Sequence, residues 1–188
     1  MTLLQVSPPA GEPVTLAAAK AHLRLDGDNE DGLVTGLIAA ARGFIETETR
    51  RALIDQGWRL CLDRRPAEGI VRLPKGPVIA VQGIVTYDPA GTPTTLAPAD
   101  YQTDLAAEPA RLWLPEIATG RRFNGIEIDF RAGYGSDGDD VPAPLRQALL
   151  MLVAHWFEVR EAAVAGVAVG PVALGVERLI APFRLVRL

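Results

Sequence analysis

The spacing of apolar residues predicts two helices near the start of the chain. Thr15 is placed to cap a first helix over residues 16–23, whose alanine-rich interior has a high helix propensity. A second helix is expected to begin after Asp28 or Asn29 and to end near Thr49. Its apolar residues recur at the spacing of one helical face: Leu33, Leu37, Ala40, Ala41, Phe44 and Ile45.

After Gly57 the period becomes alternating, which is typical of half-buried strands. Trp58, Leu60 and Leu62 alternate with more polar neighbours, and the clearest alternation in the chain lies at residues 126–131. Further strands are expected at 70–73, 78–87, 101–104 and 111–114, with 74–77 as the turn between the first two. Residues 88–91 place Asp, Pro and Gly as a type I turn favours.

The helical period returns from Pro144, with Leu145, Leu149, Leu152 and Trp156 on one stripe that ends near Arg160. A short helix and tail are expected over 175–188. The pattern therefore predicts an α+β fold, read as a single domain over residues 1–188. Its helical body would come from residues 14–55 and 140–184, with a small antiparallel β module inserted at about 56–135.

Composition narrows the class of protein. With 188 residues, of which 48% are hydrophobic, the chain can bury a core without disulfides, and the single Cys61 cannot form an internal one. The first residues lack a secretory signal, and the longest charge-free run, 162–176, is broken by glycines and Pro171, so no membrane insertion is expected. A net charge of −4 disfavours a general nucleic-acid binder.

The charge is segregated along the sequence. Residues 25–49 carry six acidic residues against Arg42, whereas residues 50–75 carry seven basic residues against three acidic ones. The two segments are either two solvated faces or the two halves of a head-to-tail contact between copies, in which unlike patches select each other. The candidate inter-subunit residues are Asp28, Glu30 and Asp31 on the acidic side and Arg50, Arg51, Arg64 and Arg65 on the basic side.

Candidate catalytic and ligand sites are weak. Residues 133–138 have the glycine spacing of a dinucleotide-binding turn, but three aspartates at 137–140 would repel phosphate, and two prolines delay the helix. The same aspartates lack the spacing of a calcium loop, and His22 and His155 have no second metal ligand at helical spacing. We therefore expect no catalytic residues, no cofactor and no metal. A small ligand- or nucleotide-binding enzyme that uses the 133–140 loop stays the alternative.

Several motifs in order resemble a known family. The central ones are Leu73-Pro-Lys-Gly-Pro-Val-Ile-Ala-Val81, Tyr87-Asp-Pro-Ala-Gly91 and Tyr101-Gln-Thr-Asp104. Others lie at 16–24 upstream and at 141–146, 152–161 and 179–184 downstream. Together they resemble the head-tail connector (adaptor) family of long-tailed phages and gene transfer agents.

The resemblance implies a structural protein of the virion, assembled in the bacterial cytoplasm, and no catalysis. It would form a ring of twelve copies beneath the portal protein and extend the DNA channel, through which DNA passes without specific binding. The ring would dock a stopper, another tail-side connector or the tail. A neighbouring virion part, such as the stopper or the tail terminator, is the second alternative.

The C-terminus is apolar and basic, since no acidic residue follows Glu177. In the family that the chain resembles, the C-terminal segment is associated with portal contact, so the resemblance implies a portal-contact set. We also expect that residues 178–188 can be removed with little loss of stability. The expected contact residues are Arg178, Phe183, Arg184, Arg187 and Leu188.

Overall fold

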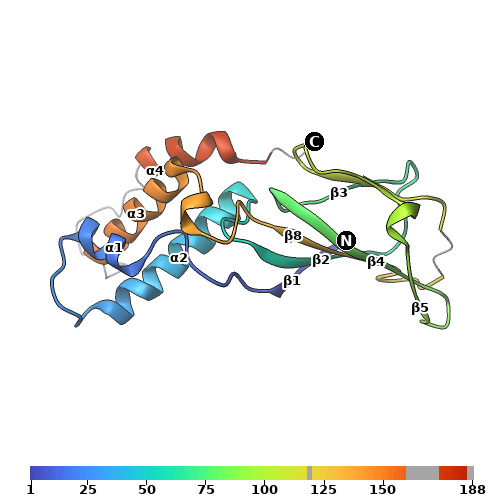
Figure 1. Cartoon of the computed structure of the whole chain (residues 1–188), viewed down its shortest axis with the longest axis horizontal. Helices are drawn as coiled ribbons and strands as arrows, with labels where there is room; N and C mark the ends of the chain where they lie inside the picture. The colour runs from blue at the N-terminus through green and yellow to red at the C-terminus, as the bar shows by residue number, and fades with distance from the viewer. Residues whose placement is uncertain (118–119, 160–173, 186–188) are drawn as a thin grey trace, which may run out of the picture. The chain divides into compact units, whose positions relative to one another are not determined.

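A computed structural model describes residues 1–117, 120–159 and 174–185 of the chain (Figure 1). The chain divides into two compact units, each built from separate stretches of sequence. The β unit comprises Met1–Ala10 and Asp55–Tyr134, and the helical unit comprises Gly11–Ile54 and Gly135–Leu188. Four helices and two antiparallel sheets are described, so the α+β prediction is confirmed.

The β unit contains a five-stranded sheet in the order β1-β2-β8-β4-β5 and a three-stranded sheet in the order β3-β7-β6. All the neighbouring strands are antiparallel. The strands are β1 (Thr2–Ser7), β2 (Gln56–Leu62), β3 (Ile70–Arg72), β4 (Val78–Tyr87), β5 (Pro93–Thr95), β6 (Gln102–Asp104), β7 (Arg111–Trp113) and β8 (Ile126–Ala132).

Strand β8 is the centre of the larger sheet, because it pairs with β2 on one side and β4 on the other (Figure 1). Its alternate residues Ile126, Ile128, Phe130 and Ala132 are fully buried. This is the apolar face that the alternation at 126–131 predicts. The burial of Phe130, the largest of these side chains, supplies a substantial part of the packing of the unit.

The opposite face of β8 carries charges that are paired within the chain. Arg59 of β2 donates to both oxygens of Asp129, from Nε and Nη2 at 2.7 Å each. It also lies 3.0 Å from Glu127, which accepts from the Tyr87 hydroxyl at 3.1 Å. Planar, two-point contacts of this kind fix the register of neighbouring strands as well as adding to their stability.

The smaller sheet corrects one prediction about the strands. Strands β3 and β4 do not form a hairpin around residues 74–77, because β3 pairs with β7 while β4 joins the five-stranded sheet. The pairing of β3 extends past its ends, with Leu114 N donating to Gly69 O at 2.8 Å. Gly69 has a φ of +75°, and a Cβ there would lie 2.6 Å from Leu114 O, so only glycine fits.

In the helical unit, α1 (Leu16–Leu23) and α2 (Asp31–Thr49) follow the predicted bounds closely. Thr15 caps α1 as expected, its Oγ1 accepting from Ala18 N at 3.1 Å. The expected side-chain cap of α2 by Asp28 or Asn29 is wrong, because Glu30 is the N-cap residue and makes no side-chain cap bond. The buried face of α2 is formed by Val34, Ile38, Ala41 and Ile45. Ala41 and Ile45 belong to the predicted face, whereas Val34 and Ile38 each lie one residue after a predicted one.

Helix α3 (Ala143–Glu158) packs on α1, α2 and α4 (Leu174–Ile180), so it is the central helix of this unit (Figure 1). The stripe predicted for α3 is largely confirmed, since Leu145, Leu149 and Leu152 are buried. Trp156 is half-buried and meets Phe44 of α2 edge to face, with ring centroids 6.0 Å apart.

The expectation of a helical body with a small inserted β module is too narrow. The N-terminal strand β1, which the sequence pattern does not predict, adds an edge to the large sheet and draws the first ten residues into the β unit. The β unit is therefore not a simple insertion between helices. None of the helices in the described ranges combines the length and the apolar character needed to cross a bilayer.

Candidate interaction surfaces

The acidic residues at the start of α2 are partly neutralised within the helical unit. Lys20 of α1 lies 2.6 Å from Asp31 and 3.1 Å from Asp28. The hydrogen bonds that Lys20 donates, first to Asp31 and then to Asp28, raise the pKa of its ammonium. Any stability from this contact is present below the ordinary lysine pKa of 10.5 and is lost as the pH rises beyond it. Asp28 still leaves 91% of its side chain exposed.

The basic residues of segment 50–75 have different environments. Arg50 is an exposed residue at the end of α2 with a φ of +58°, and Arg64 is exposed in the β unit. Arg51 is only 6% exposed, and its Nε donates to Phe183 O at 2.6 Å. Arg65 is half-buried and donates from Nε to Leu114 O at 3.0 Å. Arg50 and Arg64 thus remain the residues of this set most open to a partner.

The C-terminal segment is fastened to the end of α2. After α4, the short helix η3 (Ala181–Phe183) leads to Leu185, whose backbone N donates to Thr49 O at 3.1 Å. Arg184 Nη2 lies 2.8 Å from both Glu48 and Glu177. Arg178 is exposed, whereas the predicted residues Arg187 and Leu188 lie outside the described residues.

The expectation that residues 178–188 can be removed with little loss of stability is wrong. Ile180 is fully buried and Val176 is 1% exposed, and α4 packs on α3. Removing the segment would open the core of the helical unit and would leave the buried Arg51 without the Phe183 carbonyl. The sequence signal for this role lay in the apolar residues 179 and 180, which are not among the expected contact residues.

The 133–140 loop does not form a nucleotide site. It follows a strand of an antiparallel sheet and leads into the short helix η2 (Gly138–Asp140), in place of the strand-to-helix turn of a parallel sheet. Asp140 Oδ2 accepts from Asp137 N at 3.1 Å, which closes the loop on itself. No group of three His, Cys, Asp or Glu side chains in the described part of the chain could hold a metal ion. Burial raises the pKa of the Cys61 thiol, which disfavours a reactive thiolate.

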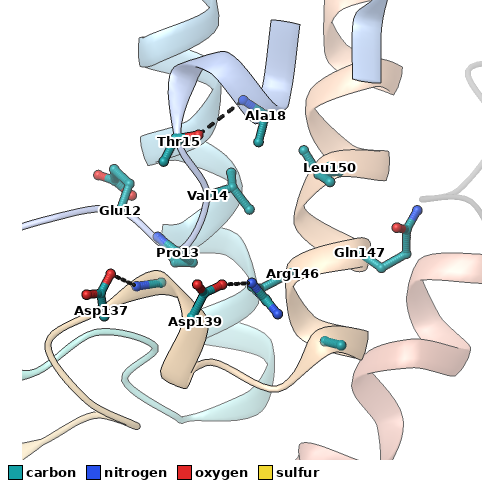
Figure 2. Close-up of a pocket in the computed structure, with 12 residues that line it drawn as sticks. Glu12, Pro13, Val14, Thr15, Ala18, Asp137, Asp139, Arg146, Gln147 and Leu150 are labelled. Atoms are coloured by element: carbon teal, nitrogen blue, oxygen red, sulfur yellow. Dashed lines mark hydrogen bonds and ion pairs between the residues drawn. The ribbon is translucent and has the colours of Figure 1, made fainter. Parts of the chain in front are cut away.

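A pocket of 410 Å³ lies in the helical unit between the segment that enters α1 and the start of α3 (Figure 2). Its apolar wall includes Val14, Ala18 and Leu150. The charged lining residues are Glu12, Asp137, Asp139 and Arg146. Arg146 pairs with Asp139, as Figure 2 shows, and Glu12 is held by Arg42 at 2.8 and 3.2 Å.

The acidic character of this pocket comes mainly from Asp137. Its side chain accepts from Gly138 N at 3.1 Å, and it has no cationic partner among the residues that the structure describes. Sequence reasoning missed this pocket, because its two walls are more than a hundred residues apart in the chain.

The β unit presents a second feature that the sequence analysis missed, the loop Arg121-Arg122-Phe123-Asn124, named here the RRF loop. Phe123 is 68% exposed, and both arginines are exposed. The loop is anchored at both ends: Arg121 stacks on the Tyr87 ring, 5.2 Å from its centroid, and Asn124 N donates to Asp63 Oδ1 at 3.0 Å. Arginine and aromatic side chains are enriched at interface hot spots.

Comparison with known proteins identifies the family. Residues 13–89 match the family described as phage gp6-like head-tail connector protein. A solved structure described as the neck of an empty GTA particle computed with C6 symmetry contains a chain with 33% identity and a TM-score of 0.83. The similarity covers 100% of this chain and 97% of that one. No curated protein matches.

Two further structures agree. A chain in the virion of a native gene transfer agent (GTA) particle is 33% identical with a TM-score of 0.81, and one in the neck of a native GTA particle computed with C12 symmetry is 31% identical with a TM-score of 0.80. Each similarity covers 100% of this chain and 97% of the other. The chain belongs to the phage head-tail connector family, and this family consists of structural proteins, not enzymes.

Replacing Ile180 by alanine tests the structural role of α4. Because Ile180 is fully buried, we expect the free energy of unfolding to fall by about 2–5 kcal/mol. Urea unfolding followed by circular dichroism measures the change. Arg178→Ala on the same helix is the control and should change stability by less than about 0.5 kcal/mol, because Arg178 is exposed. Equal stability of both variants would contradict the packing of α4.

Proposed function

We propose that the protein is the head-tail adaptor of a phage or gene transfer agent particle, and that it forms a ring beneath the portal. The ring extends the DNA channel and docks the stopper, another tail-side connector or the tail. The main support is similarity over the full length to a chain in particle necks that were computed with C6 and C12 symmetry. Twelve copies agree with both symmetries. We propose that both units together make one adaptor domain.

A particle made without this protein tests the adaptor role. Heads and tails of long-tailed particles assemble separately in this proposal, so we expect DNA-filled or leaking heads beside normal free tails. Electron microscopy of the particles gives the measurement. Intact tailed particles would rule out the adaptor role, and free heads that carry an assembled adaptor density would favour a stopper or a tail terminator instead.

We propose that the acidic residues at the start of α2 contact basic residues of the next copy in the ring. Asp28, Glu30 and Asp31 form the acidic side, and Arg50 and Arg64 are the exposed members of the basic set. The contact would be heterologous, since a closed ring joins two different patches of each subunit. Of these acids, Asp28 offers the most exposed carboxylate because it lies outside the helix and is 91% exposed.

A charge exchange separates this surface from the internal pair with Lys20. The variant Lys20→Glu, Asp28→Lys, Asp31→Lys keeps opposite charges in contact within the chain while reversing the exposed carboxylate of Asp28 and the partly buried one of Asp31. We expect the melting temperature to change little, since the exchange keeps opposite charges paired and a pair near the surface contributes about 1 kcal/mol or less. Ring formation, measured by sedimentation velocity or on heads, should weaken by about tenfold or more. If the variant assembles as well as the unchanged protein, this acidic face does not contact a neighbouring copy and is only solvated.

We propose that the C-terminal segment contacts the portal through Arg178, Phe183, Arg184, Arg187 and Leu188. Arg178 is exposed on α4, and guanidinium groups make two-point contacts with carboxylates. Arg184 is already shared between Glu48 and Glu177, so its main role is to hold the segment in place.

A truncation after Leu185 tests the portal contact without opening the core. It keeps Ile180 and the bond from Leu185 N to Thr49 O, so the melting temperature should not change. Co-sedimentation with portal-containing heads should be lost in the truncated protein when it is combined with Arg178→Glu. Arg72→Glu, an exposed change in the β unit, is the matched control and should bind as the unchanged protein does. Full binding by the truncated double variant would place the portal contact elsewhere on the chain.

A further inference from the structure

We propose that the RRF loop of one copy docks into the helical-unit pocket of a second copy of this chain. The inference rests on the ring proposed above and names a contact that would hold neighbouring subunits together. It begins from two features of the surface: an exposed aromatic residue that follows two arginines, and a pocket with an apolar wall and acidic residues.

The loop has the chemistry of an interface anchor. Phe123 leaves 68% of its surface exposed to water. Burial of this apolar surface against a partner would be favourable. Arg121 and Arg122 directly precede Phe123, so an aromatic ring and two cations lie within three residues. The bond from Asn124 N to Asp63 and the stacking of Arg121 on Tyr87 hold the loop, which lowers the entropy lost on binding.

The pocket offers the complementary chemistry. Its volume of 410 Å³ is near the lower end of the range for ligand sites, about 300–1,000 Å³, and suits one large side chain with its neighbours. Val14, Ala18 and Leu150 provide apolar surface for a ring. Asp137, which has no cationic partner among the described residues, provides a carboxylate for an arginine. Asp139 pairs with Arg146 but leaves 91% of its side chain exposed, so it provides a second carboxylate.

A second copy is the occupant that the charge pattern favours. A head-to-tail ring requires two different, complementary surfaces on every subunit. This chain carries a basic aromatic loop in its β unit and an acidic apolar pocket in its helical unit, so each copy can give one and receive one. DNA could attract the arginines of the loop, but it would be repelled by the carboxylates of the pocket.

The experiment uses charge reversal in full-length protein added to adaptor-free heads. Loop variant Arg121→Glu, Arg122→Glu and pocket variant Asp137→Lys, Asp139→Lys are tested alone and as an equal mixture. Each alone should leave at least about tenfold fewer copies bound per head. The mixture should restore binding, because unchanged loops fit unchanged pockets and reversed loops fit reversed pockets in an alternating ring. Restoration by mixing also shows that the contact joins different copies.

Two uncharged variants keep the test independent of charge reversal and of its effects on folding. Phe123→Ala removes the anchor, and Ala18→Phe fills the pocket from an exposed position on α1. Both should keep the melting temperature of the unchanged protein and bind about tenfold less. The matched controls are Arg72→Glu and Asp26→Lys, which change exposed charges outside both surfaces and should bind fully.

The outcomes separate a failure of the proposed function from a failure of the loop–pocket contact. If the unchanged protein does not bind heads, the proposed function fails, and this inference fails with it. If it binds heads and the loop and pocket variants bind equally well, only this inference is overturned. Loss of binding in the loop variants alone would mean that the loop meets DNA or another protein, and loss in both without restoration by mixing would also overturn the contact between copies.

Discussion

The two units of this protein are each closed by contacts between segments far apart in the sequence, and the rest of the structure depends on that constraint. In the β unit, β2 pairs with β8, which lies some seventy residues further along the chain. Strand β1 pairs with β2 although α1 and α2 separate the two strands in the sequence. In the helical unit, α2 packs on α3, and Leu185 bonds to Thr49. Such closures cost loop entropy, which only extensive burial can offset.

Several arginines stabilise these closures. Those that join distant segments are bonded within the chain: Arg42 to Glu12, Arg59 to Asp129, Arg51 to the Phe183 carbonyl and Arg131 to Asp55. The arginines at 64, 122 and 178 are instead exposed. A ring protein needs both kinds, since the first kind fixes its shape and the second can meet a neighbour. Counting charges along the sequence cannot separate them, as the pairing of Lys20 with Asp28 and Asp31 shows.

Local signals in the sequence predicted the elements that depend on local physics. Thr15 and the alanines after it define α1, and the alternation in β8 identifies its buried face. The pattern failed where partners decide the outcome. Strand β1 has no signal beyond a short apolar run, and β3 has the same pattern whether it pairs with β4 or with β7. Two helical stripes on α2 have the same spacing, and only packing selects the one through Val34 and Ile38.

The interaction surfaces were predictable to a lesser degree. The resemblance of ordered motifs gave the family, which full-length similarity to neck proteins confirms. It did not show that Ile180 belongs to the core, or that residues 12–18 and 137–150 meet around a pocket, because both depend on the folded helical unit. Exposure of Phe123 likewise follows from the loop before β8 that carries it, and a phenylalanine in sequence alone suggests the opposite.

Cryo-electron microscopy of the neck in the assembled particle tests the central claim most directly. The account predicts a closed ring between portal and tail whose repeating unit fits both the β unit and the helical unit of this chain. Neck density in that position that fits neither unit, or density for this chain only elsewhere in the particle, would contradict it.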